Sequence, residues 1–440
     1  GFETGYFHFA GKAKSEDEKH SIFSTAWSTV ALVALFFLAL VLGFCGPIAG
    51  VMGYANNPSY VAVVAGIVAL DVITAIPFAR VREQGKALKY VTIRTLSVVI
   101  NIVFTVFFFS ALPYLTESLG GFWMSIYRPE SITGYVFVAN LIASFAVLLM
   151  LFPSNLKLLG RGIDRKQLGV IAMYSLPLLI SGIAGTANEF IDRQMIKYVM
   201  PASESMAALG IYGAVVKIGV ILLLFTQMYR LAAEPYFLSG FSKKDFVRTN
   251  AEALKYFIVA SVFIFLMITL FTDIFALIVG ADFREGMYIL PVVLLSNMLS
   301  GVVFNLSFWY KQAAKTKFAM YVTITGLVFT VLLNFALIPV LGYFGAALAR
   351  LGCEIAMVAL SYYLNRRHYP TPYDLPRIGL YLLGGAVIYG ASMLFVEPNF
   401  GILPKNLINL GLLGLFATFV VRRENINVVE MFKSIIKTRL

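Results

Sequence analysis

The sequence has 440 residues, of which 59% are hydrophobic, 15% are aromatic and only 13% are charged. A soluble globular domain has about a quarter of its residues charged, so this composition excludes one and indicates a membrane protein. The formal net charge of +12 raises nucleic acid as a partner, a question that the positions of the basic residues decide.

Apolar segments recur along the whole chain, each near or above the roughly 20 residues that an α-helix needs to cross the hydrocarbon layer. The predicted fold class is therefore an all-α polytopic membrane protein. We expect twelve helices, at residues 22–45, 55–79, 91–113, 131–153, 169–189, 205–231, 254–280, 287–310, 318–340, 343–365, 376–396 and 402–421.

The basic residues lie on one side of this predicted topology. Alternate loops, beginning with residues 1–21 and ending with residues 422–440, carry 28 of the 35 Lys and Arg residues. The intervening loops carry five, and Lys217 and Arg350 fall inside helices. By the positive-inside rule the basic loops and both ends of this chain are cytoplasmic. The charge is thus explained by topology, and no nucleic-acid partner is expected.

The two halves of the chain contain an internal repeat. A shift of 231 residues brings Glu3 onto Glu234 and the tetrapeptide YVTI at 90–93 onto the same letters at 321–324. An even number of helices separates the copies, so the predicted lobes have the same orientation. By this symmetry, six helices make a lobe, and two further helices are expected before Glu3.

Four regions follow from the repeat. Residues 1–153 are an N-terminal lobe with four of its six helices, and residues 154–168 are a cytoplasmic linker. Residues 169–365 are a C-terminal lobe of six helices. Residues 366–440 lie outside the repeat and contain two additional helices and a cytoplasmic tail. The tail has apolar residues at helical spacing with Lys and Arg between them, a pattern typical of a helix on an anionic membrane surface.

Four stretches resemble one known family. They are FETGYFHF at 2–9, NEFIDRQMIKYVM at 188–200, ALGIYGAVVKIGVILLLFTQMYRLAAEPYF at 208–237 and IPVLGYFGAALARLGCEIAMVALSYYL at 338–364. These resemble the bacterial oligosaccharide flippases of the O-antigen (Wzx-like) type, the polysaccharide branch of the superfamily that also contains the MATE drug exporters. His8 departs from that family, which more often has arginine at this place.

The resemblance implies a flippase that moves undecaprenyl-diphosphate-linked glycan units from the inner to the outer leaflet by alternating access. The implied location is the bacterial inner membrane, with membrane lipids as surroundings and a polysaccharide polymerase as a candidate partner. The sequence leaves two alternatives open. One is a cation-coupled multidrug exporter of the same fold, and the other is a peptidoglycan-precursor flippase, whose cargo carries the same diphosphate-lipid anchor.

Charged residues inside the predicted spans are the candidate site residues, because a charge in the bilayer is costly unless it faces a cavity or a partner. Lys217 and Arg350 are expected to bind an anionic headgroup in a wet cleft, without a compensating acid nearby. The alternative for Lys217 is a carbonyl or carboxylate partner between helices. The alternative for Arg350 is an ion pair with Glu354, four residues on. Arg193, beside Asp192, is a further candidate contact with substrate or, alternatively, a local salt bridge.

Asp71 is the candidate for binding a coupling H⁺ or Na⁺, with a pair to Arg80 or a helix cap as the alternatives. Glu3, His8, Arg230 and Glu234 flank the predicted cytoplasmic gate, and a structural set of salt bridges explains them equally. Neither a metal-ligand cluster nor a nucleophile with a general base is evident, so we expect no metal, no cofactor and no enzyme.

Overall fold

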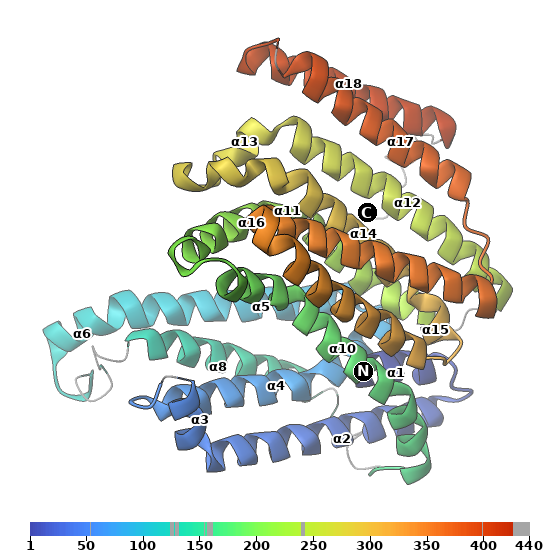
Figure 1. Cartoon of the computed structure of the whole chain (residues 1–440). Coiled ribbons are helices and arrows are strands. Elements are labelled where there is room, and N and C mark those ends of the chain that lie inside the picture. Colours follow the sequence, from blue (N-terminus) through green and yellow to red (C-terminus); the bar gives the residue numbers. More distant parts are fainter. Residues whose placement is uncertain are drawn as a thin grey trace. The chain divides into compact units, whose positions relative to one another are not determined.

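The computed structural model describes residues 1–52, 54–123, 127, 132–153, 155, 162–238, 243–397 and 399–425. All regular elements in these ranges are helices, and eleven of them are long and apolar enough to cross a membrane. The chain is a multi-pass membrane protein (Figure 1). Residues 426–440 of the predicted tail helix, and residues 154 and 156–161 of the predicted linker, lie outside the described residues.

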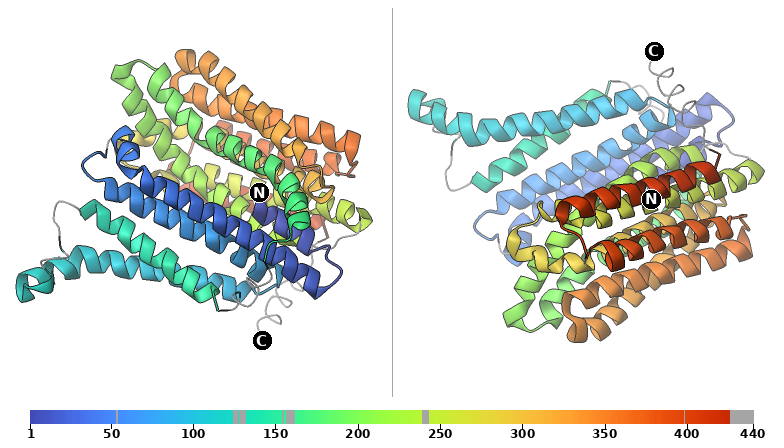
Figure 2. Two further views of the ribbon diagram at one scale, coloured as in Figure 1. Left: turned by 90° about the horizontal axis from the view of Figure 1, so that it is seen from below. Right: turned by 90° about the horizontal axis from the view of Figure 1, so that it is seen from above.

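The predicted count of twelve passes agrees with these eleven helices because one of them contains two spans. Helix α16 (Lys317–His368) has 52 residues and is interrupted at Gly342, where φ is 57°. The left-handed region is open to glycine at little cost, so Gly342 is suited to the turn predicted between residues 340 and 343. Side chains of the second arm pack on glycines of the first, Met357 on Gly326 for example. Figures 1 and 2 show the two arms side by side.

Two compact units make up the described chain, and each is treated by itself. Unit 1 is essentially residues 1–176, and unit 2 contains residues 177–237 and 243–425. They divide inside helix α10 (Arg165–Val199), between Leu176 and Pro177. A proline within a helix removes one backbone hydrogen bond, which makes this a natural place for a break. The lobe boundaries proposed from the repeat remain a prediction.

Unit 1 is built around an aromatic cluster. Tyr6, Phe7, Phe23 and Trp27 are almost completely buried, and the indole nitrogen of Trp27 donates to the carbonyl of Ile73 at 2.9 Å. The elements of unit 1 are α1 (Phe2–Ala10), α2 (Glu16–Gly43), α3 (Cys45–Val51), α4 (Pro58–Glu83), α5 (Ala87–Val106), the π-helix η1 (Phe107–Ala111), α6 (Leu112–Leu119), α8 (Ile132–Leu151) and the first third of α10.

The start of α2 shows why helices here are longer than their apolar segments. Ser15 caps the helix by accepting from the backbone N–H of Glu18 at 3.2 Å, and three acidic residues follow in the first turn. A capping hydroxyl and acidic side chains both stabilise the positive end of a helix. The helix therefore begins at Glu16, six residues before the predicted span at 22.

Unit 2 has the larger core, in which α12, α14 and α17 pack together. Its elements are the rest of α10, α11 (Ala202–Leu238), α12 (Lys243–Leu270), α13 (Thr272–Ala276), the 3₁₀-helix η3 (Ala281–Ile289), α14 (Leu290–Leu306), α15 (Phe308–Gln312), α16, α17 (Leu375–Ala391), the π-helix η4 (Ser392–Val396) and α18 (Ile402–Arg423). The last two long helices, α17 and α18, contact each other and α12.

Candidate functional site

A network of polar side chains lies inside unit 2, centred on Asp192 of α10. The carboxylate is 1% exposed and lies 3.7 Å from the guanidinium of Arg350 on α16. It also accepts hydrogen bonds from the Tyr212 hydroxyl at 3.3 Å and from the Asn334 side-chain amide at 3.1 Å. Helix α11 and both arms of α16 thus supply donors to one buried carboxylate, as a buried charge requires.

Two polar rungs join α10 to the first arm of α16. Thr330 donates to Asn188, and Asn334 donates to Asp192 one helical turn further along both helices. The residue numbers differ by 142 in both pairs, so the two helices run in the same direction where these rungs form. In an apolar bundle such interhelical bonds hold the helices in register.

Glu354 is the second acid of this region. Glu354 is 5% exposed, and one of its carboxylate oxygens, Oε2, has no hydrogen-bond partner among the described residues. The structure corrects the alternative that spacing suggested, because Arg350 forms its ion pair with Asp192 and not with Glu354. Two carboxylates therefore share the neighbourhood of one guanidinium, an arrangement that can accept a proton or a small cation.

The expectation of two cations without compensating acids is wrong for Arg350, since Asp192 neutralises it. Lys217 is different. It lies near the middle of α11, is exposed, and has no ion pair among the residues that the structure describes. Arg193, half-exposed, has its guanidinium carbon 6.0 Å from the centre of the Phe190 ring, whereas its neighbour Asp192 is buried with Arg350.

Asp71 lies on α4 in unit 1 and is exposed. Its carboxylate accepts a hydrogen bond from the Ser144 hydroxyl of α8 at 2.8 Å. The suggested pair with Arg80 is not found: Arg80 donates to Asn155 at 2.8 Å and lies over the ring of Phe23. Asp71 therefore remains an accessible carboxylate with one neutral partner, available to a cation.

The predicted gate residues of unit 1 both have close partners. Glu3 forms an ion pair with Arg82 of α4. His8 is 2% exposed, stacks on Tyr174 with ring centres 4.6 Å apart, and has its Nε2 3.2 Å from the Lys12 ammonium. Burial, reinforced by the positive charge of Lys12, lowers the pKa of His8 to about 4. The imidazole is therefore neutral at physiological pH.

The predicted gate residues of unit 2 belong to a buried ion pair. Glu234 at the end of α11 lies 3.2 Å from the Lys311 ammonium of α15 and 3.9 Å from Arg230. Glu234 and Lys311 are 5% and 8% exposed. The salt-bridge interpretation of these gate residues therefore has direct geometric support.

Several residues of the Asp192 network were not predicted from the sequence. Tyr212, Asn188, Thr330 and Asn334 were not candidates, although Asn188 with Asp192, and Thr330 with Asn334, stand four residues apart in otherwise apolar helices. That spacing places both polar residues of each pair on one helix face, and it was the sequence feature that could have indicated these residues. No group of three or more metal-ligating side chains occurs within the described ranges.

Comparison with known proteins identifies the fold. A mutant of the Vibrio cholerae MATE transporter VcmN matches with a TM-score of 0.68 at 13% identity, covering 84% of this chain and 85% of that one. The eukaryotic MATE transporter AtDTX14 matches with a TM-score of 0.60 at 13% identity, covering 86% of each chain. The lipid II flippase MurJ, in an inward closed conformation, matches with a TM-score of 0.51 at 14% identity.

The MurJ match covers 97% of this chain and 90% of that one. No protein-family model and no curated protein sequence matches the chain. At identities of 12–14% these likenesses establish the fold alone. The chain has the fold of the MATE transporters and of MurJ.

Proposed function

We propose that the protein is a lipid-linked oligosaccharide flippase, which moves undecaprenyl-diphosphate-linked glycan units from the inner to the outer leaflet by alternating access. It would act in the bacterial inner membrane, with both ends of this chain cytoplasmic and a polysaccharide polymerase receiving its product. The glycan would serve the assembly of a surface polysaccharide.

The extent of the MurJ match is the observation that carries this proposal. A match over 97% of 440 residues leaves about 13 residues outside it. Because α17 has 17 residues and α18 has 22, the match includes part of both. The VcmN match covers 84% of the chain, leaving about 70 residues outside. We base the preference for a lipid flippase over a drug exporter on this wider coverage, although the VcmN match has the higher TM-score, 0.68 against 0.51.

Lys217 supports an anionic cargo. A lysine within a membrane-spanning helix costs at least a few kcal/mol unless water or an anion reaches it. Lys217 is exposed and has no ion pair among the described residues, so its charge is available to the phosphates of a diphosphate-linked lipid.

Coupling to H⁺ or Na⁺ has two candidate places. Asp71 offers an exposed carboxylate, and the Asp192 network offers two buried carboxylates to one guanidinium. The same excess of buried acid favours the second candidate function, a cation-coupled multidrug exporter. The third, a peptidoglycan-precursor flippase, would share the diphosphate recognition proposed for Lys217.

The test uses a strain that lacks the protein and is complemented with variants. Lys217→Ala is expected to abolish surface glycan at unchanged protein level, and Lys217→Arg to restore part of it. Lys197→Ala is the control, because Lys197 is also exposed but lies in the last turn of α10. Surface glycan that is unchanged in Lys217→Ala would remove this residue from the site.

Three cargoes are separated in the same strains. Loss of glycan on deletion, without change in resistance to cationic drugs, supports the glycan flippase. Loss of drug resistance with normal glycan would establish the exporter instead. Rescue of a strain depleted of its peptidoglycan-precursor flippase would favour that third function.

A further inference from the structure

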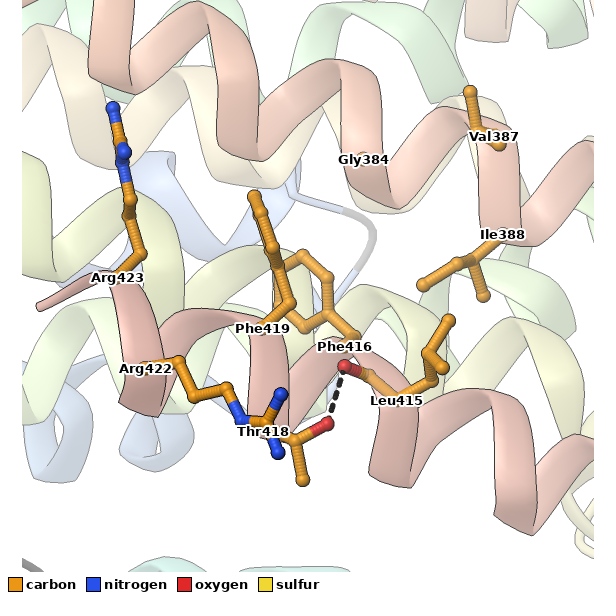
Figure 3. Close-up of a pocket in the computed structure, with 9 residues that line it drawn as sticks. All are labelled: Gly384, Val387, Ile388, Leu415, Phe416, Thr418, Phe419, Arg422 and Arg423. Atoms are coloured by element: carbon orange, nitrogen blue, oxygen red, sulfur yellow. Dashed lines mark hydrogen bonds between the residues drawn. The ribbon is translucent and has the colours of Figure 1, made fainter.

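A groove in unit 2 lies between the last two long helices, on the surface of the described chain (Figure 3). Its volume is about 580 Å³. The walls are apolar, formed by Gly384, Val387 and Ile388 of α17 and by Leu415, Phe416 and Phe419 of α18. Since both helices are membrane-spanning candidates, hydrocarbon is the natural occupant of this part of the groove.

Gly384 keeps the groove open between the helices. A Cβ atom at this position would lie 3.7 Å from the Phe419 ring and 3.9 Å from the Phe416 ring, which is ordinary van der Waals contact. A larger side chain at 384 would therefore enter the space in front of these rings without striking backbone. Val387 and Leu415, each 61% exposed, complete an apolar surface that is open to the outside.

One end of the groove is positively charged. Arg422 and Arg423 line it in the last turn of α18, and both are exposed. In Figure 3 the Arg422 side chain lies beside Thr418, and the Arg423 side chain extends away from it at the same end of the groove. Neither forms an ion pair among the residues that the structure describes.

The acid next in sequence does not neutralise these arginines. Glu424 has a side chain that is 3% exposed and pairs with Lys255 of α12. It also accepts from the Tyr381 hydroxyl and lies 3.8 Å from the guanidinium of Arg377. Its negative charge is therefore already shared by other groups, and no acid among the described residues neutralises the two guanidinium groups at this end of the helix.

We propose that this groove binds one anionic glycerophospholipid, with an acyl chain against Gly384, Phe416 and Phe419 and the phosphate on Arg422 and Arg423. Guanidinium groups bind phosphate oxygens in paired, geometrically defined hydrogen bonds. An apolar channel that ends in two arginines without an ion pair in the described part of the chain matches a molecule with a hydrocarbon chain and an anionic headgroup. By the predicted topology, the lipid belongs to the cytoplasmic leaflet, which carries anionic lipid. This site is independent of the proposed cargo.

Native mass spectrometry of the full chain in detergent tests the proposal, with phosphatidylglycerol and phosphatidylcholine of identical acyl chains as probes. The wild type is expected to retain one phosphatidylglycerol more tightly than phosphatidylcholine. Each arginine near an anionic lipid contributes about fivefold in affinity, so Arg422→Gln with Arg423→Gln is expected to weaken phosphatidylglycerol binding about 25-fold. Binding of phosphatidylcholine is expected to change little.

A matched pair of arginines controls for general surface charge. Arg366 and Arg367 are likewise adjacent, exposed and in the last turn of their helix, α16, but lie outside this groove. Arg366→Gln with Arg367→Gln is expected to leave the tight lipid bound. An equal loss in both double variants would show only diffuse attraction and overturn the site, as would equal retention of the two lipids by the wild type.

Filling the groove tests the acyl chain separately. Gly384→Leu is expected to lower occupancy by both lipids, whereas Gly390→Leu, on the same helix with nothing within 4 Å of its Cβ position, is expected to leave it unchanged. Both replacements raise helix propensity, and thermal unfolding in detergent verifies that each variant is folded. Unchanged binding in folded Gly384→Leu would overturn the proposal.

Two further binding experiments identify the molecule that carries the anion. Displacement of the lipid by glycerol phosphate, which has no acyl chain, would assign the arginines to a soluble phosphate and contradict the proposal. Tight binding of a polyprenyl phosphate with no preference for phosphatidylglycerol would assign the groove to a different lipid and contradict it equally.

Discussion

The two units place their charged side chains differently. Six Asp, Glu or Lys residues are buried in the described chain, namely Asp192, Glu234, Lys255, Lys311, Glu354 and Lys405, and all six belong to unit 2. The buried titratable side chain of unit 1, apart from tyrosine, is His8, which is neutral. Its membrane acid, Asp71, is exposed and bound to a serine.

This difference separates two kinds of polar site. A buried charge in unit 2 destabilises the fold when its partner of opposite charge is removed. An exposed acid such as Asp71 contributes little to stability and is free to serve binding. We therefore expect substitutions of the buried charges of unit 2 to affect folding first, and Asp71 substitutions to affect transport with little effect on stability.

Removing Arg350 should have the largest effect. Arg350→Met leaves Asp192 and Glu354 buried without their cation, and breaking a buried pair in this way costs about 3–5 kcal/mol. The measurement is the free energy of unfolding in mixed micelles. Arg350→Met with Asp192→Asn removes the charge at residue 192 and keeps one side-chain oxygen to accept a hydrogen bond, and should recover at least half of the loss. If the double variant is no more stable than the single one, the ion pair is not the cause.

His8 should make unit 1 sensitive to acid. The folded pKa of about 4 lies below the ordinary value of 6.5, so the neutral ring's contribution is complete above pH 6.5 and is lost as pH falls toward 4. Integrated over this window, the loss is about 3 kcal/mol. His8→Gln should remove that part of the pH dependence, and half-exposed His20 supplies the control variant His20→Gln. The same acid sensitivity in His8→Gln would contradict this assignment.

The Glu234–Lys311 pair should matter more than a surface pair. Glu234→Gln keeps an acceptor near Lys311 but removes the charge, and a hydrogen bond to a charged group contributes about 1.5–3 kcal/mol. Glu252→Gln breaks the Arg248–Glu252 pair, whose side chains are 84% and 55% exposed, and should cost about 0.5 kcal/mol or less. Thermal unfolding of the two variants compares them directly, and equal shifts would show that burial does not set the strength.

Asp71 should show the smallest effect on stability. Asp71→Asn preserves the bond from Ser144 and should change the free energy of unfolding by about 0.5 kcal/mol or less. Transport that loses its dependence on a proton or sodium gradient in this variant would assign coupling to unit 1. Transport that keeps this dependence would leave the Asp192 network as the coupling candidate. Ser144→Ala serves as the control for the hydrogen bond alone.

Apolar segments predicted the spans because hydrophobic length is a property of the sequence alone. Each of the twelve predicted segments overlaps one or more helices of the structure, and the interruption of α16 at Gly342 falls between the predicted segments 318–340 and 343–365. Helix ends were less predictable. Helix α10 continues to Val199, ten residues beyond the predicted end at 189, since polar side chains there find partners on other helices.

Partners across helices account for most of what the sequence could not predict about the site. Glu354 was the apparent partner of Arg350 because both stand on one helix face, yet Asp192 of another helix provides the ion pair. Spacing along one helix shows which of its residues lie on the same face. It does not show which residues of another helix pack against that face. Lys217 has no ion pair among the described residues, and its role in binding stays a prediction.

The hairpin in α16 has a consequence for movement. Thr330 and Asn334 lie on its first arm, and Arg350 and Glu354 lie on its second, beyond the turn at Gly342. Gly345 packs so closely on the backbone of Leu337 that no side chain fits between the arms near this turn. This close contact opposes sliding of one arm of α16 along the other near the turn. We therefore expect a displacement of the first arm that breaks the bond from Asn334 to move Arg350 as well, so that Asp192 would lose its amide partner and its cation together.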